Sequence, residues 1–218
     1  MPERPGVVRT ELILGGQRSG KSRRAEALAQ RWLAESPRHR AVLIATAQPW
    51  DDEMRERIAR HQQDRAARVP GMLAVEEPLA LGTALAQHSD TQTLVVVDCL
   101  TLWLTNCLMP YESAEKQPAH AENGLDYESN RAVAHELPAQ AAMLLIVIKK
   151  AAGPVVLVGN EIGLGVIPMG RETRAFVDAL GRLNQDVAAV CERVTFMAAG
   201  VADRKRLRDG AVPASGRR

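Results

Sequence analysis

The sequence contains few aromatic residues, few cysteines and almost no net charge. Phe, Trp and Tyr together make up 3% of the 218 residues, which argues against a stacking surface for single-stranded nucleic acid. The 28 basic and 26 acidic residues leave a formal net charge of +2, which gives no reason to expect attraction of the whole protein to DNA, RNA or an anionic membrane. Composition therefore argues against nucleic acid as a partner.

Cysteines and long apolar runs are also scarce. The three cysteines, Cys99, Cys107 and Cys191, form no C-x-x-C pair, which predicts buried reduced thiols rather than disulfides or zinc ligands. The first residues carry charge and lack the apolar core of a signal peptide. The longest dense apolar run, Met143 to Ile148, is much shorter than the roughly 20 residues that cross a bilayer. We therefore expect a soluble, cytoplasmic protein without a membrane span.

Short apolar runs alternate with stretches of helical pattern along most of the chain. The runs are nearly continuous in apolar residues, which is typical of a parallel sheet covered on both faces. The alternation predicts an α/β fold with a mostly parallel sheet flanked by helices. The expected strands are 11–15, 41–46, 72–75, 93–98, 154–159 and 193–198, and the expected helices are 21–35, 51–65, 79–88, 100–108, about 131–151 and 171–191.

Two segments depart from this pattern. Residues 110–130 are polar and without a clear period, which predicts a long loop or an insertion. The tail from Ala202 to Arg218 has six basic residues among Gly, Pro and Ser, and we expect a flexible terminus there rather than a nucleic-acid arm. The expected organisation is an N-terminal extension (1–10), a single catalytic domain (11–200) and a basic tail (201–218).

Residues 15–22 read GGQRSGKS and match the phosphate-loop pattern G-x-x-x-x-G-K-S, between an apolar strand and a helical stretch. Glycines let successive backbone N–H groups surround a phosphate, and the helix N-terminus adds partial positive charge. Lys21 is expected to contact the β and γ phosphates, and the Ser22 hydroxyl to bind Mg²⁺. The predicted nucleotide-binding residues are Gly15, Gly16, Gln17, Arg18, Ser19, Gly20, Lys21 and Ser22.

A second magnesium ligand is expected at Asp98. The apolar residues 94–97 lead into this carboxylate and place it at the carboxyl end of a strand, where ligands bind in open α/β sheets. The alternative is that Asp98 only caps the helix that begins near Leu100. The presence of a phosphate loop favours the magnesium site.

The helix expected at 51–65 carries a histidine. Asp51 or Asp52 can cap this helix, and Met54, Ile58 and His61 share one face by their spacing. Spacing alone favours a half-buried structural histidine.

Two further loops follow expected strands. A carboxylate of Glu76 or Glu77 could accept hydrogen bonds from a base or ribose, although a capped turn at 76–78 is the simpler interpretation. Residues 159–165, GNEIGLG, lack the glycine spacing of a dinucleotide fingerprint and indicate a loop at the ligand edge of the sheet.

In this order, these stretches resemble the family of bifunctional adenosylcobinamide kinases and adenosylcobinamide-phosphate guanylyltransferases of cobalamin biosynthesis. The resemblance extends from about residue 12 to residue 200, and several independent motifs in order are more specific than a phosphate loop alone. Its marks are GGQRSGKS at 15–22, IATAQPWDDEMRERIARH at 44–61, VEEP at 75–78, VVVDCLTLWLTN at 95–106, GNEIGLGVIP at 159–168 and RETRAFVDALGRLNQDVA at 171–188.

The resemblance implies two reactions in sequence. The family phosphorylates the primary hydroxyl of the cobinamide aminopropanol arm with ATP or GTP. It then transfers GMP from GTP onto that phosphate and releases pyrophosphate. The chemistry of the transfer resembles a ping-pong reaction through a guanylylated histidine, and the matching position is His61. A neutral imidazole can attack a phosphorus atom, and covalent catalysis divides one difficult step into two.

The resemblance also assigns further residues and an assembly. The catalytic residues are then Lys21 and His61, in a RecA-like phosphate-loop fold and a homotrimer. The implied guanine-nucleotide contacts are Thr46, Ala47, Gln48, Gln62, Gln63, Asp64, Arg65, Glu76 and Asp98. Two other functions remain open from the residues themselves: a small-molecule kinase in which His61 is structural, and a RecA-like ATP-dependent nucleic-acid binder.

Overall fold

The computed structural model describes residues 6–109, 126–165 and 167–206. Within these ranges the chain forms seven strands and six helices. The strands are β1 (Thr10–Gly15), β2 (Arg40–Ala45), β3 (Leu73–Glu76), β4 (Thr93–Asp98), β5 (Val155–Asn160), β6 (Arg193–Ala198) and β7 (Val201–Arg206). The helices are α1 (Lys21–Glu35), α2 (Asp52–Arg68), α3 (Leu81–His88), α4 (Leu100–Leu108), α5 (Asp126–Lys150) and α6 (Arg171–Val190).

All seven strands belong to one sheet with the order β3-β2-β4-β5-β1-β6-β7. Strands β1 to β6 pair in parallel, and β7 pairs antiparallel with β6. The carboxyl ends of the parallel strands therefore lie at one edge, where ligands bind in open α/β sheets. Strand β5 lies between β1, which leads into the phosphate loop, and β4, which ends at Asp98. This arrangement confirms the expected α/β architecture with a mostly parallel sheet flanked by helices.

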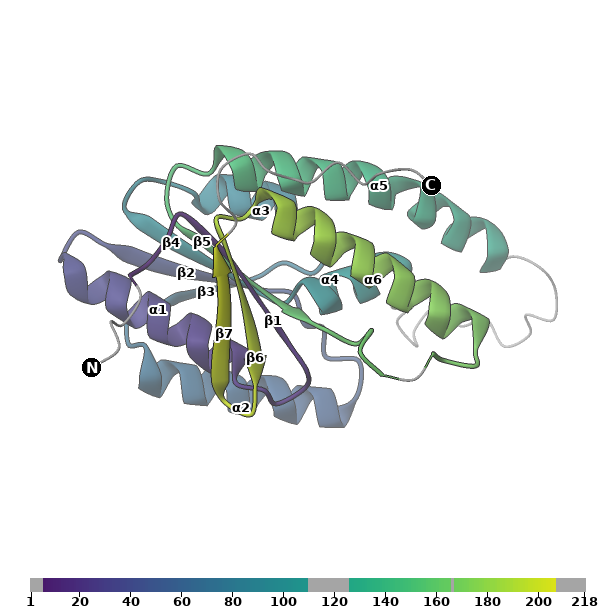
Figure 1. Cartoon of the computed structure of the whole chain (residues 1–218), viewed down its shortest axis with the longest axis horizontal. Helices are drawn as coiled ribbons and strands as arrows, with labels where there is room; N and C mark the ends of the chain where they lie inside the picture. The colour runs from purple at the N-terminus through teal and green to yellow at the C-terminus, as the bar shows by residue number, and fades with distance from the viewer. Residues whose placement is uncertain (1–5, 110–125, 166, 207–218) are drawn as a thin grey trace.

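Helices cover both faces of the sheet (Figure 1). Helices α3 to α6 pack on one face, over a core that contains Trp103, Leu144 and Leu183. Helix α1 packs on the other face through Ala25, Leu28 and Ala29. Side chains of β4 alternate between the two cores, which is why the whole strand is apolar: Val95 and Val97 join the first, and Leu94 and Val96 the second.

Most element boundaries lie within one or two residues of those predicted, but two helices are longer. Helix α2 ends at Arg68, and its N-cap is Asp51, whose Oδ1 accepts a hydrogen bond from the Met54 N–H at 2.7 Å. Helix α5 begins at Asp126, so residues 126–130 are helical and not part of the predicted loop. The rest of that loop, residues 110–125, lies outside the described residues.

The sheet also extends beyond the predicted end of the domain. Residues 201–206, expected to belong to a flexible tail, form β7 and pair with all of β6. A turn with positive φ at Ala199 and Gly200 makes this hairpin possible. Pairing satisfies backbone groups that β6 would otherwise expose as an edge strand. The boundary of the folded domain therefore moves from residue 200 to residue 206, and the remaining tail, 207–218, lies outside the described residues.

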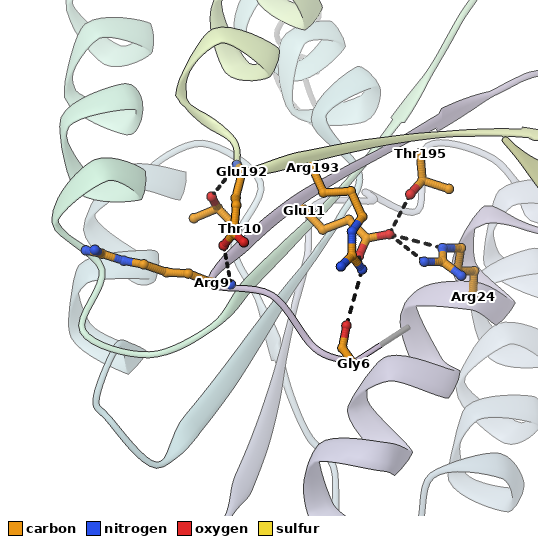
Figure 2. Close-up of polar contacts among 8 residues, drawn as sticks. All are labelled: Gly6, Arg9, Thr10, Glu11, Arg24, Glu192, Arg193 and Thr195. Carbon is orange, nitrogen blue, oxygen red and sulfur yellow. Dashed lines mark hydrogen bonds and ion pairs between the residues drawn. The ribbon is translucent and has the colours of Figure 1, made fainter. Parts of the chain in front are cut away.

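A buried charge network joins β1, α1 and β6 (Figure 2). The side chain of Glu11 is 1% exposed, and its Oε1 accepts hydrogen bonds from Arg24 Nη2 and Thr195 Oγ1, both at 2.7 Å. Its Oε2 accepts from Arg193 Nη1 at 3.1 Å, and Arg193 also donates to the Gly6 carbonyl. Arg24 lies one turn after the phosphate-loop lysine, so this network attaches the first turns of α1 to the sheet.

Candidate active site

The phosphate loop between β1 and α1 requires glycine at two positions. Gly15 and Gly20 have φ values of 156° and 98°, and a Cβ on Gly15 would collide with the Met197 carbonyl. The Gly200 N–H donates to the Ser19 carbonyl at 3.0 Å, so the β6–β7 turn supports the loop. Gly20 is the N-cap of α1, and no side chain caps this helix. An uncapped helix start suits a phosphate ligand, which can accept hydrogen bonds from the first N–H groups.

Lys21 turns back toward its own loop. Its Nζ donates to the carbonyls of Gly15 at 2.9 Å and Gly16 at 2.6 Å, and the residue is 8% exposed. Burial lowers the pKa of Lys21, the negative charge of Asp98 opposes this shift, and the positive charge of Arg57 adds to it. Residues from β4 and α2 therefore lie within electrostatic range of the phosphate-loop lysine.

Asp98 is available for a ligand rather than used as a helix cap. The N-cap of α4 is Cys99, whose Sγ accepts a hydrogen bond from the Leu102 N–H at 3.5 Å. This finding removes the alternative that Asp98 caps the helix. Asp98 is half-buried and near Lys21, and Ser22 follows Lys21 in the first turn of α1.

These two residues offer a carboxylate and a hydroxyl oxygen, which are the hard donors that Mg²⁺ takes together with water and phosphate oxygens. Among the described residues, no group of three or more His, Cys, Asp or Glu side chains could hold a metal ion. A magnesium ion bound largely by nucleotide and water needs no such group. The residues present therefore fit magnesium.

Thr46 lies beneath the site and joins two strand ends. It is fully buried, and its Oγ1 donates to the Cys99 carbonyl at 2.7 Å and accepts from the Cys99 N–H at 2.9 Å. The Thr46 carbonyl accepts from Asn106 Nδ2 at 2.7 Å, and the same amide nitrogen donates to the Pro78 carbonyl at 3.0 Å. Asn106, which sequence reasoning missed, therefore holds together the segments that lead into α2 and α3. Ala47 and Gln48, which follow Thr46, are half-buried.

Helix α2 carries several of the predicted residues but packs loosely. None of its residues is buried, and its inward face shows only half-buried side chains, including Met54, Arg57 and Ile58. His61 shares this face by its spacing, yet the structure places it exposed, which corrects the expected partial burial. The helix is attached mainly at its end, where Val69 is buried and Arg68 pairs with Glu26 of α1.

A hydrogen bond joins α2 to β3. Gln62 Nε2 donates to Glu76 Oε1 at 3.3 Å, so two predicted nucleotide contacts from different elements lie side by side. The neighbouring Glu77 forms the capped turn, because its Oε1 accepts from the backbone N–H groups of Leu79 and Ala80. Glu77 is therefore the residue that caps the turn predicted at 76–78.

The other predicted contacts on α2 are Gln63, Asp64 and Arg65. Asp64 pairs with Arg68 at 2.7 Å, Gln63 is exposed, and Arg65 is half-buried. The structure thus places Asp98 and Arg57 of α2 within electrostatic range of Lys21 in the phosphate loop, while Gln62 and Glu76 are hydrogen-bonded to each other.

Comparison with known proteins identifies relatives over nearly the whole chain. Residues 11–204 match the family model described as cobinamide kinase / cobinamide phosphate guanyltransferase. The bifunctional adenosylcobalamin biosynthesis protein CobP of Pseudomonas aeruginosa is 42% identical over 192 residues, which cover 88% of this chain and 94% of that protein. CobU of Escherichia coli, with the same description, is 34% identical over 190 residues, which cover 87% and 96% of the two chains.

Among solved structures, the flagellar accessory protein FlaH from Methanocaldococcus jannaschii matches with a TM-score of 0.43 at 10% identity, over 91% of this chain and 76% of that one. The match to the family model spans the phosphate loop, His61 and Asp98. The chain belongs to the family of cobinamide kinases and cobinamide phosphate guanyltransferases.

Proposed function

We propose that this chain performs both reactions of its family at the carboxyl edge of the sheet, with the phosphate loop in the first and His61 as nucleophile in the second. The observation that carries the proposal is that Asp98, at the end of β4, and Arg57, on α2, both lie within electrostatic range of the phosphate-loop Lys21. Residues so placed can bind a nucleoside triphosphate and neutralise the charge on its phosphates.

In the first reaction, a γ-phosphoryl group passes from ATP or GTP to the primary hydroxyl of cobinamide. The acceptor oxygen forms a bond to the γ-phosphorus, the bond to the β-phosphate oxygen breaks, and the hydroxyl proton is released. Lys21 leaves the Gly15 and Gly16 carbonyls and pairs with the β and γ phosphates, since a phosphate is a better partner for an ammonium than a neutral carbonyl. Gly20 and the uncapped start of α1 supply backbone N–H groups to the same phosphates.

In the second reaction, an imidazole nitrogen of His61 attacks the α-phosphorus of GTP. A phosphorus–nitrogen bond forms, the bond between the α-phosphorus and its bridging oxygen breaks, and pyrophosphate leaves. A phosphate oxygen of cobinamide phosphate then attacks the guanylyl phosphorus, and the phosphorus–nitrogen bond breaks to release the histidine. The exposure of His61 supports this role, because the imidazole is accessible to a bound nucleotide.

Labelling with α-³²P GTP tests the role of His61. Wild-type protein should retain acid-labile label after denaturation, and His61→Ala should retain none while it still forms most of the cobinamide phosphate from ATP. His88→Ala, at the end of α3, is the matched control and should label as wild type does. If His61→Ala forms the adduct, the nucleophile is another residue. If wild type makes no guanylylated product at all, the chain is a kinase only.

We also propose that Ser22 and Asp98 hold Mg²⁺ with the nucleotide. When bound, the ion would neutralise phosphate charge and orient the phosphates for in-line attack. Asp98→Asn keeps the size of the side chain but removes its charge, so the Mg²⁺ concentration for half-maximal kinase activity should rise at least tenfold. An unchanged magnesium dependence in this variant would remove Asp98 from the ion's ligands.

The proposed assembly is a homotrimer and the proposed compartment is the cytoplasm. The trimer rests on the family resemblance, and light scattering coupled to size-exclusion chromatography measures it directly. No described helix is both long and apolar enough to cross a membrane. The three cysteines are free thiols in buried positions, which suits a reducing compartment.

A further inference from the structure

The segment between β5 and α6 exposes large apolar side chains. Leu164 is 77% exposed, Ile167 76% and Met169 95%, which makes them the three most exposed large hydrophobic side chains among the described residues. Ile162, in the same segment, is 42% exposed. The only charged residue from 161 to 169 is Glu161. An apolar group of this kind in a water-exposed position commonly marks a binding surface.

This segment begins beside the phosphate loop. The Glu161 N–H donates to the Gly15 carbonyl at 3.1 Å, directly after the end of β5. Because β5 lies between β1 and β4, the segment leaves the sheet between the phosphate loop and Asp98. Figure 1 shows it running out from the end of β5, beside β1, toward the start of α6.

Both ends of the segment are fixed by hydrogen bonds. At the start, Glu161 Oε1 accepts from the Gly163 N–H at 2.7 Å and forms a short turn. At the other end, Arg174 Nη1 donates to the carbonyls of Pro168 at 2.9 Å and Met169 at 2.6 Å. The exposed apolar side chains therefore lie on a segment that starts beside the phosphate loop, and hydrogen bonds are made at both of its ends.

We propose that Leu164, Ile167 and Met169 form the acceptor subsite and contact the corrin macrocycle of cobinamide. This inference rests on the proposed function, in which the acceptor hydroxyl must approach the γ-phosphorus. The rest of the acceptor then lies within the length of its aminopropanol arm from the phosphate loop. The corrin periphery of cobinamide carries methyl groups between uncharged amide side chains, so it offers apolar contacts to a surface that is nearly without charge.

The nucleotide is a poor occupant for this surface. Its phosphates need N–H donors and cations, which the phosphate loop and Lys21 supply. Its base has polar partners available at Gln62 and Glu76, next to α2 and β3. A second copy of this chain is the other possible occupant. The acceptor is favoured because the hydrogen bond from the Glu161 N–H to the Gly15 carbonyl places the start of the segment beside the phosphate loop.

The test is equilibrium dialysis with cobinamide on the double variant Leu164→Gln/Ile167→Gln. Both side chains are exposed, so the substitutions should leave the fold intact. Loss of two apolar contacts should weaken cobinamide binding about tenfold or more and raise the KM for cobinamide equally. The KM for ATP should not change. The matched control is Met143→Gln/Ile146→Gln on α5, where the two side chains are 47% and 52% exposed, and binding there should equal wild type.

Each other outcome has a definite meaning. If the wild type neither binds nor phosphorylates cobinamide, the proposed function fails. If the wild type does both and Leu164→Gln/Ile167→Gln binds cobinamide as tightly, the acceptor subsite is elsewhere. A change in oligomeric state of this variant by light scattering assigns the surface to a subunit contact, and a raised KM for ATP assigns the effect to the phosphate loop. Both of these results overturn the proposal.

Discussion

Lys21 is a buried cation that the backbone of its own loop holds in place. Two carbonyls accept its hydrogen bonds, and burial lowers its pKa. The folded state therefore disfavours the charged form of Lys21 relative to the unfolded state, and the protein loses stability by keeping it charged at neutral pH. A function explains why a lysine that lowers the stability of the fold occupies this position, because phosphoryl transfer needs a positive charge there.

Replacing Lys21 with Met should separate activity from stability. Lys21→Met keeps an unbranched chain but removes the charge, so kinase activity should fall by about a thousandfold or more. The melting temperature should stay the same or rise, because no buried ammonium remains. Cobinamide phosphorylation and thermal unfolding at pH 7 measure the two effects. Near-normal phosphorylation by this variant would contradict the assignment of the phosphate loop.

At the scale of elements, α1 and α2 differ in how firmly they are attached. Helix α1 packs on the sheet through Ala25 and Leu28 and is also held through Arg24 by the buried carboxylate of Glu11 (Figure 2). Helix α2 has no buried residue and is held by contacts near its end. The phosphate loop thus leads into a helix that is packed on the sheet, while His61 lies on a helix that has no buried residue.

The Glu11 network should contribute strongly to stability. Glu11→Gln leaves Arg24 and the 4%-exposed Arg193 without their countercharge, and breaking a buried ion pair in this way costs about 3 kcal/mol or more. The exposed pair of Asp52 and Arg55 provides the control, and Asp52→Asn should cost less than about 1 kcal/mol. Urea unfolding at pH 7 measures both free energies. Equal losses in the two variants would show that burial does not strengthen the Glu11 network.

At the scale of the whole molecule, the three thiols lie in the interior. Burial raises the pKa of Cys99 and Cys191 to about 12, and that of Cys107 to about 11. Because the folded pKa lies above the unfolded value, each thiol holds its proton to higher pH in the folded state. Their contribution to stability is fully present below about pH 9 and is lost as pH rises toward 12.

The free energy of unfolding should therefore fall steeply above pH 9. For a thiol that is protonated when folded and ionised when unfolded, the slope approaches about 1.4 kcal/mol per pH unit. Cys191→Ala removes one such group, so its unfolding free energy should fall less steeply than that of wild type between pH 9 and 10.5. Urea titrations at several pH values measure this difference. Parallel curves for the two proteins would show that the Cys191 thiol titrates alike in both states.

Local patterns in the sequence are enough to predict the fold class, the phosphate loop and the position of Asp98 at the end of a strand. These features depend on local patterns: apolar runs that must be buried on both faces, glycines that allow positive φ, and a carboxylate at the end of a strand. No local pattern in the sequence predicts the hydrogen bonds that Thr46 and Asn106 make. Their hydrogen bonds cross from β2 to α4, between residues 60 positions apart, and only the packed sheet brings those atoms within bonding distance.

The end of the sheet and the side chains that face water depend on how the elements pack, so local patterns do not predict them. Residues 201–206 read as a basic tail, yet β6 offers a free edge, and pairing with it outweighs their polar composition. His61 has the spacing of an inward-facing residue but is exposed, because α2 lies at the surface and buries no side chain. The sequence predicts a loop at 159–165, and only the structure shows that its Leu164 is 77% exposed. Whether a residue is buried depends on which other elements pack against it, and the sequence indicates only which residues favour burial.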